Sequence, residues 1–286
     1  MSGPLLAIDT PWLLYRSHFG LPRSIKGADG EPIGALLGTV NTILALADWC
    51  SPRAVVCCFG AEEAAYRVRL YPPYHAHRDP MPAALRARWA QAPGLLEAFG
   101  WAVATDPVLE ADDLLWSLSR AEAAAGGHTL ICSADRDLYQ AVDAHTRVIE
   151  LRRAGAPGTI DAAGVHARSG VAPAQIPDLI ALRGDPSDGL PGARGIGAKT
   201  AAALLTEYGS LEAVLGAAAT QRPRIAAALA AQAEELRMFR EVATLQEVAV
   251  VAPPSGATRL LAGAQAAREL GMNQLAARLT AADALQ

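Results

Sequence analysis

Short apolar runs alternate with segments of helical periodicity through the first half of the chain. The runs are five or six residues long and almost wholly apolar, which is typical of strands buried on both faces; they cover 5–9, 54–59, 101–106, 128–133 and 147–151. Between them, apolar residues recur at helical spacing over 34–50, 83–100 (interrupted at Pro93) and 110–126. Strands separated by helices predict an α/β core, a parallel sheet with helices on both faces.

The second half of the chain has a different pattern. Strand signals stop after about residue 160, and helical periodicity recurs in the segments 161–170, 173–184, 198–208, 210–218 and 222–245. We expect the apolar run 248–253 to return to the sheet and 252–257 to form a loop. The pattern therefore predicts two domains, an α/β core over residues 1–165 and a helical region over 166–286.

Composition narrows the class of protein only modestly. A chain of 286 residues that is 51% hydrophobic can bury one large core or two modest ones. Its net charge of -4 gives no global basic field for nucleic acid, although a carboxylate cluster can offset a local basic surface. The start of the chain lacks a basic signal-peptide region, and no apolar run approaches the roughly 20 residues of a membrane span. We expect no membrane association and a soluble cytoplasmic protein.

The four cysteines indicate no metal site. Cys57 and Cys58 are adjacent in an apolar strand, so they should point to opposite faces of the sheet. No CxxC spacing occurs, and the cysteines are expected to be reduced, buried and small apolar residues.

Acidic residues follow the predicted strands at the point where each strand ends. The candidates fall in four separate segments, the last of which follows a short predicted helix: Asp9, then Glu110, Asp112 and Asp113, then Asp135 and Asp137, then Asp185 and Asp188. Any one alone fits a helix cap or a turn. Together they should meet at one edge of the sheet, where they would repel one another unless a cation is bound. Oxygen ligands suit Mg²⁺ or Mn²⁺, and the absence of histidine or cysteine from the pattern argues against zinc. Sites of this kind commonly hydrolyse phosphodiesters with two metal ions.

The stretch 184–205, GDPSDGLPGARGIGAKTAAALL, looks at first like a nucleotide-binding loop. Ala198 follows Gly197, so the lysine comes one residue too late for the Walker pattern, and no buried strand precedes the loop. A glycine turn that opens a helix still offers free N–H groups to an anion. With its flanking helices the stretch is similar to a helix-hairpin-helix, which grips a DNA backbone phosphate without reading sequence. Lys199 is notable because Lys26 is the only other lysine in an arginine-rich chain.

These motifs, in this order, resemble bacterial 5′-nucleases of the flap endonuclease family, similar to the 5′→3′ exonuclease domain at the N-terminus of DNA polymerase I. The resemblance rests on LLAIDTPWLLYRSHFGLP, YRVRLYPPYHAHR, LEADDLLWSL, SADRDLYQ and LRGDPSDGLPGARGIGAKTA. It implies a PIN-like or Rossmann-like nuclease core, a short helical arch over about 79–93 and a free-standing nuclease with no polymerase domain.

The resemblance also implies roles for particular residues. The first metal would be held by Asp9, Glu110 and Asp112, and the second by Asp135, Asp137, Asp185 and Asp188, with Asp135 near both. Arg78, with His75 weakly, would stabilise charge on the scissile phosphate. The remaining DNA contacts implied are Arg67, Arg86, Arg88, Gly192, Gly195, Gly197, Lys199 and Thr200. The helix-hairpin-helix of this family commonly holds K⁺ between its carbonyls and the phosphate.

Three positions depart from the family pattern. Gly60 stands where the family has an aspartate near the first metal; Glu62 or Glu63 are the nearest alternatives, and we expect both at the surface. His75 replaces a lysine, and it carries less charge at pH 7. Gly189 replaces the asparagine usual after Asp188, which reads as a tolerated change in a turn.

The sequence thus predicts a monomeric, metal-dependent 5′ nuclease that acts on DNA with a 5′ flap or 5′ end in the nucleoid. A flap- or junction-binding protein with weakened catalysis is the alternative that Gly60 and His75 leave open. A PIN-like RNase is a third reading, against which the hairpin argues.

Overall fold

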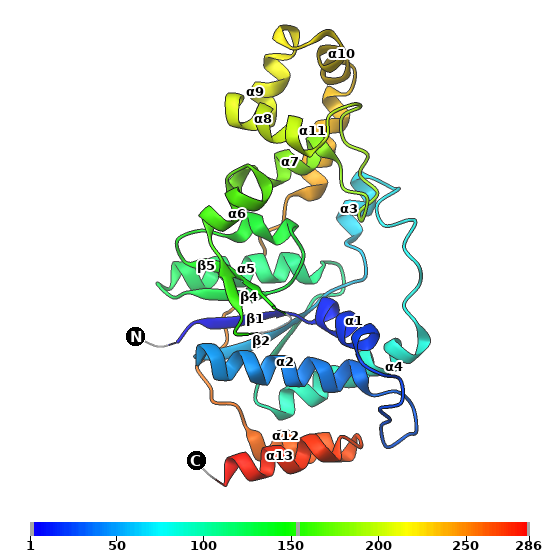
Figure 1. Cartoon of the computed structure of the whole chain (residues 1–286), viewed down its shortest axis with the longest axis vertical. Coiled ribbons are helices and arrows are strands. Elements are labelled where there is room, and N and C mark those ends of the chain that lie inside the picture. Colours follow the sequence, from blue (N-terminus) through cyan, green and yellow to red (C-terminus); the bar gives the residue numbers. More distant parts are fainter. Residues whose placement is uncertain (1–2, 153–154, 285–286) are drawn as a thin grey trace.

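The first half of the chain forms a twisted sheet at the centre of the molecule. The structure is a computed structural model that describes residues 3–152 and 155–284. Within those residues the sheet has six strands in the order β3-β2-β1-β4-β5-β6 (Figure 1). The strands are β1 (Leu5–Asp9), β2 (Ala54–Phe59), β3 (Ala102–Thr105), β4 (Thr129–Cys132), β5 (Thr146–Glu150) and β6 (Gly158–Ile160).

Strands β1 to β5 are parallel, as the sequence predicts, and β6 pairs antiparallel with β5. All five predicted strands are confirmed to within about a residue at each end. Strand β6 was not predicted, because three residues beginning with a glycine give no periodic signal.

Alternate side chains of the sheet enter two separate cores. Leu5 and Ala7 face one core with α5 (Ala111–Ala124), α6 (Ala162–Ser169) and α7 (Ile176–Arg183). Leu6 and Ile8 face the other core with α1 (Thr10–Gly20), α2 (Gly34–Cys50) and α4 (Ala83–Ala98). Cys58 belongs to the first core and Cys57 to the second, which confirms their opposite orientation. The two helical layers lie on opposite sides of the sheet in Figure 1.

Residues 176–243 are mainly helical and extend away from the sheet toward the top of Figure 1. The helices of this region are α7, α8 (Ala198–Tyr208), α9 (Leu211–Gly216), α10 (Pro223–Ala231) and α11 (Ala233–Ala243). A short helix α3 (Ala65–Leu70) from the first half packs beside α11.

Two expectations about local structure are wrong. Residues 248–253 form no strand; Val248 donates its N–H to Ser117 and the Pro253 carbonyl accepts from Arg53, while Pro253 and Pro254 have no N–H for a ladder. Pro93 does not interrupt its helix, since α4 runs through it from Ala83 to Ala98.

The chain ends in a helical pair that returns to the core. Helices α12 (Leu260–Glu269) and α13 (Asn273–Asp283) bury Ala264, Ala267 and Leu275 in the same core as α2 and α4. Gly263 lies against the ring of Phe99, where a Cβ would come within 2.4 Å. The last helices therefore complete the α/β layer, and the proposed domain boundary at 165/166 stays a prediction.

No helix in the described part of the chain is long and apolar enough to cross a bilayer.

Candidate active site

The predicted acidic residues line one hollow region at the carboxyl ends of β1 and β4. A cavity of about 720 Å³ is lined by six of them: Asp9, Glu110, Asp112, Asp135, Asp137 and Asp188. An adjoining hollow of about 640 Å³ shares Asp9, Asp135 and Asp137 and adds Asp185. The topology thus brings four separate segments of the sequence to one place, which we call the acidic cleft.

Asp9 is fixed at the centre of this cleft by local structure. It ends β1 and caps α1, since its Oδ1 accepts the Trp12 N–H at 3.0 Å. The Ser133 hydroxyl donates to Oδ2 at 2.6 Å and also accepts the Asp135 N–H at 3.0 Å. Burial raises the pKa of Asp9 to about 6. The hydrogen bonds from the Ser133 hydroxyl and the Trp12 N–H lower this pKa and so oppose the effect of burial. Ser133 is a supporting residue that the sequence analysis did not identify; its position as the first residue after β4 was the available signal.

The neighbouring acids oppose one another's ionisation. Burial, followed by the charges of Asp135 and Asp9, raises the pKa of Asp112 well above its usual value. Burial and the charge of Asp135 do the same for Asp137. Such a cluster binds a hard cation favourably, because the cation removes the repulsion.

The acids are not assembled into a ready-made centre. Across residues 3–152 and 155–284, no group of three His, Cys, Asp or Glu side chains is arranged to hold a metal ion. The donor set nevertheless suits Mg²⁺ or Mn²⁺, since it consists of carboxylate oxygens lining an accessible cleft.

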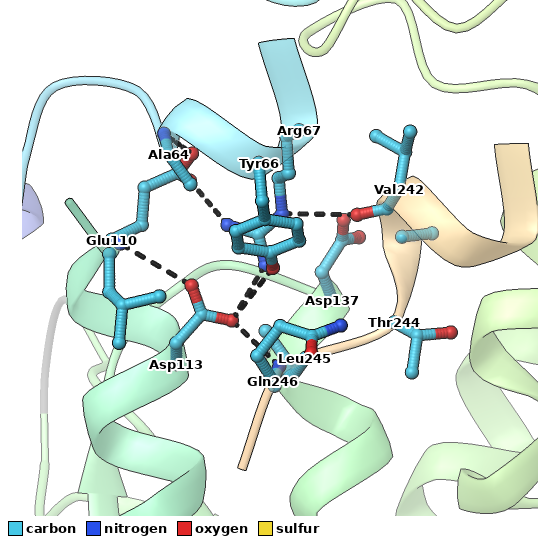
Figure 2. Close-up of polar contacts among 12 residues, drawn as sticks. Ala64, Tyr66, Arg67, Glu110, Asp113, Asp137, Val242, Thr244, Leu245 and Gln246 are labelled. Carbon is cyan, nitrogen blue, oxygen red and sulfur yellow. Dashed lines mark hydrogen bonds and ion pairs between the residues drawn. The ribbon is translucent and has the colours of Figure 1, made fainter. Parts of the chain in front are cut away.

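Glu110 enters the cleft already bound by three protein groups. Its Oε1 accepts the Ala64 N–H at 2.7 Å, and its Oε2 accepts the Tyr74 hydroxyl at 3.1 Å. The Arg67 guanidinium lies 3.1 Å from the same Oε2. Figure 2 shows Ala64, Arg67 and Glu110 together with Asp113, whose carboxylate accepts from both Arg67 and Tyr66.

Two arginines expected to contact DNA lie inside the protein. Arg67 is 4% exposed and pairs with Glu110 and Asp113. Arg88 is 2% exposed and forms two bonds of 2.8 Å with Asp29, beside a third to the Pro32 carbonyl. Their guanidinium groups are occupied by protein acceptors, so the structure gives both arginines a packing role in place of the expected surface contact. Arg86, on the same helix α4 as Arg88, is exposed.

Arg78 and His75 converge on one carboxylate. Arg78 Nη2 and His75 Nε2 each lie 3.1 Å from Oδ1 of Asp188. The Arg78 side chain is about half exposed on the wall of the cleft, whereas His75 is buried and stacks on Tyr74 with ring centroids 3.8 Å apart. His75 has φ 56°, and its Nδ1 is buried without a partner among the described residues. Arg78 is thus the more accessible of the two side chains at this wall.

Gly60 occupies a position with no room for a side chain. A Cβ at Gly60 would lie 2.3 Å from the backbone nitrogen of Ala111 and 2.4 Å from the carbonyl carbon of Glu110. The end of β2 therefore rests directly on the start of α5, and an aspartate cannot fit there without a backbone shift. Glu62 and Glu63 are exposed, as expected, yet both line the cleft.

The glycine-rich loop between α7 and α8 has two parts. Asp185 and Leu190 exchange backbone hydrogen bonds of 2.8 Å, which form a small hairpin that carries Asp188, and Gly189 at its turn has φ 75°. Gly192 is buried against Gly184, so its role is close packing and not the surface contact we expected.

The second part of the loop faces solvent. Gly195, Gly197 and Lys199 are exposed and Thr200 is half-buried at the start of α8. The Arg224 guanidinium lies beside Gly195, 3.3 Å from the position a Cβ would take. Arg224 was not identified from the sequence, because it lies in a different helix.

A parallel sheet with an acidic cleft at its carboxyl edge, followed by a helix–loop–helix, defines the class of PIN-like nuclease cores with a helical second part. Comparisons with known proteins agree with this class. The family model of the 5′-3′ exonuclease N-terminal resolvase-like domain matches residues 4–170, and that of the 5′-3′ exonuclease C-terminal SAM fold matches residues 171–258. The chain therefore belongs to the 5′-3′ exonuclease family, a family of nucleases.

Named relatives span most of this chain. A 5′-3′ exonuclease of Mycobacterium tuberculosis is 36% identical over 80% of this chain and 78% of its own length. A 5′-3′ exonuclease of Streptomyces coelicolor is 37% identical over 77% of both chains. DNA polymerase I of Deinococcus radiodurans is 38% identical over 75% of this chain, but only 22% of the polymerase is covered.

Solved structures show the same fold at low identity. The T5 5′-exonuclease with bound zinc gives a TM-score of 0.68 at 20% identity, covering 96% of both chains. The catalytic core of Rad2 in complex with DNA gives a TM-score of 0.63 at 14% identity, covering 97% of this chain and 93% of that one.

Proposed function

We propose that this protein is a divalent-metal-dependent, structure-specific 5′ nuclease. It hydrolyses DNA phosphodiesters at a 5′ flap or a free 5′ end and leaves a 5′-phosphate and a 3′-hydroxyl. The observation that carries the proposal is the convergence of seven predicted acids on one cleft, with Arg78 on its wall. Membership of the 5′-3′ exonuclease family supports the same reaction class.

The carboxylates would hold two or more Mg²⁺ or Mn²⁺ ions. Asp9, Glu110 and Asp112 would form one set, and Asp135, Asp137, Asp185 and Asp188 the other, with Asp135 near both. Bound ions of this kind supply an activated water and neutralise charge on the attacking and leaving oxygens. The raised pKa values of Asp9, Asp112 and Asp137 support the proposal, because bound cations would relieve the repulsion that causes part of them.

The chain's own cations would orient the phosphate. Arg78 is held by Asp188 and keeps about half of its side chain exposed, so its guanidinium can turn to a phosphate oxygen. His75 is buried against Tyr74 and Asp188, so its weaker contribution would be to hold Asp188 and, through it, Arg78. Arg86 extends the same basic wall along α4.

The loop before α8 would hold the duplex away from the cut. Exposed N–H groups near Gly195 and Gly197, with Lys199 and Thr200, suit a backbone phosphate, and a K⁺ ion between the loop carbonyls and that phosphate is part of the proposal. We further propose that the protein acts as a monomer in the cytoplasm, at the nucleoid.

Substitution of one shared acid tests the mechanism. Asp135→Ala removes one of the three carboxylates that border both hollows, and because Asp135 is exposed the fold should be retained. We expect cleavage of a labelled 5′-flap substrate in Mn²⁺ to fall more than about 100-fold, since even indirect metal partners contribute 10–100-fold. Glu269→Ala, an exposed acid on α12, should leave cleavage unchanged. Equal activity of Asp135→Ala and wild type would reject the mechanism.

One observation favours the alternative function, a flap- or junction-binding protein with weakened catalysis. It is the missing space for a carboxylate at Gly60. A protein of that kind would bind flap DNA in EDTA, bind no Mn²⁺ and cleave nothing. Comparison of flap DNA with single-stranded RNA as substrates separates the third reading, a PIN-like RNase.

A further inference from the structure

Arg67 is a buried cation on the lining of the acidic cleft, and it has three protein partners. Its Nη1 lies 3.1 Å from Glu110 Oε2, and its Nη2 donates to Asp113 Oδ1 at 2.9 Å. Its Nε donates to the Val242 carbonyl at 3.0 Å. All three nitrogens of the guanidinium therefore contact protein acceptors, and these acceptors come from two distant parts of the chain.

On one side this guanidinium orients Glu110. That carboxylate also accepts from the Ala64 N–H and the Tyr74 hydroxyl, so three donors fix its rotation. Ionised oxygens keep lone pairs for a further partner, which leaves Glu110 able to face the cleft that it lines.

On the other side Arg67 and Asp113 hold the end of α11. Arg67 binds the carbonyl of Val242, the penultimate residue of that helix, and Asp113 Oδ1 accepts the Gln246 N–H at 2.8 Å (Figure 2). At the other end of α11, Gln232 accepts the N–H of Arg194 at 2.8 Å, in the glycine-rich loop. Helix α11 therefore connects the loop that we propose to bind the duplex with the residues bonded to Arg67.

We infer that Arg67 and Asp113 are positioning residues: they fix Glu110 as a metal-binding side chain and join it to α11, whose first end contacts the duplex-gripping loop through Gln232. This inference rests on the proposed function. It replaces a phosphate contact by Arg67, which its burial among protein acceptors disfavours. Partners that orient ligands in this way typically contribute 10–100-fold to metal affinity or activity.

Arg67→Lys distinguishes a role in positioning Glu110 from a direct contact with a DNA phosphate. Lysine keeps the charge but presents a single ammonium, which cannot serve Glu110, Asp113 and the Val242 carbonyl in the fork geometry of arginine. We expect Mn²⁺ binding, measured by titration calorimetry, and kcat for flap cleavage each to fall about 10–100-fold. The Kd for flap DNA in EDTA and KM should change less than about twofold, since no phosphate contact is lost.

Asp113→Asn provides a second variant, because it removes the negative charge that Arg67 pairs with at residue 113, while Glu110 keeps its own ion pair with Arg67. It should shift Mn²⁺ binding in the same direction by less, and it decides the question if Arg67→Lys does not fold. Arg69→Lys is the matched control: Arg69 is exposed on the same helix α3 and should alter neither quantity.

Unchanged Mn²⁺ binding with weaker DNA binding, and a salt slope reduced by about 1, would overturn the inference and restore a phosphate contact. The wild type serves as the reference for the proposed function itself. If wild type neither binds Mn²⁺ nor cleaves, the proposed function fails; if wild type does both and the two variants match it, only this inference fails.

Discussion

At the residue scale, the interpretation of Gly60 changes once its neighbours in the structure are known. In the sequence it is a missing acid; in the structure it is the point where the end of β2 touches the backbone of Glu110 and Ala111. Arg67 and Arg88 change in the same manner, from expected surface contacts to buried cations with protein partners. At the residue scale, contact geometry decides function more than residue type does.

Gly60→Ala should destabilise the protein, because its Cβ would meet backbone atoms that cannot move independently. Overpacking of this kind costs about 1–3 kcal/mol, and a chain of this size loses about 2–4 °C in Tm per kcal/mol. Differential scanning fluorimetry measures the change. Gly94→Ala is the control, since nothing lies within 4 Å of a Cβ there and alanine favours the helix. An unchanged Tm for Gly60→Ala would contradict the close approach.

Asp9→Asn should stabilise the metal-free protein at neutral pH. The folded pKa of about 6 lies above the unfolded value of 3.8, so the ionised form is disfavoured by folding and stability falls as pH rises from about 4 to 6. Asparagine avoids this cost and still caps α1. We expect the unfolding free energy in EDTA at pH 7.5 to exceed that of the wild type by up to about 3 kcal/mol, seen as a higher Tm, and the two proteins to converge near pH 4. A lower Tm for Asp9→Asn at pH 7.5 would refute the raised pKa.

At the scale of elements, the loop between α7 and α8 combines two tasks. Its first half places Asp185 and Asp188 at the acidic cleft, and its second half exposes Gly195, Gly197 and Lys199. The buried pair of Gly184 and Gly192 locks the two halves together. Binding of a duplex by the second half would therefore set the position of the first.

Lys199→Ala tests the grip of this element. Loss of one phosphate contact should weaken duplex binding to a similar degree for all sequences and reduce the slope of log K against log salt by about 1. Fluorescence anisotropy in EDTA over a salt series measures both. Arg268→Ala, an exposed cation on α12, should leave the slope unchanged. A slope that Lys199→Ala does not alter would place the duplex elsewhere.

At the scale of the whole molecule, the last two helices pack against helices from the first half of the chain. Helices α12 and α13 lie beyond the region that the family models match, at 259–286, and pack under α4 and α2. Phe99 and Trp101 stack in this layer with centroids 4.6 Å apart, and Gly263 lies against Phe99. The end of the chain thereby supports the helix that carries Arg86.

Ala267→Asp tests this support. Ala267 is fully buried on α12, and an unpaired buried charge costs several kcal/mol, so Tm and soluble yield should fall sharply. Ala262→Asp, exposed on the same helix, should have little effect. Equal Tm values for the two variants would show that α12 does not pack on the core in solution.

The sequence by itself determined the parallel α/β core and the set of cleft acids. Buried strands and amphipathic helices differ in period, and parallel strands deliver their terminal acids to one edge whatever the details of packing. That is why spacing could bring Asp9, Glu110, Asp135 and Asp137 to one edge, whereas the choice of Asp112 over the adjacent Asp113 rested on the family resemblance.

Only the tertiary structure decided which cations face solvent, why residue 60 is glycine, and where the last helices lie. Each depends on a contact between segments far apart in the chain, such as Arg67 with Val242 or Gly263 with Phe99. Local periodicity carries no information about such contacts, because it reports which face of an element is apolar and not which element covers that face.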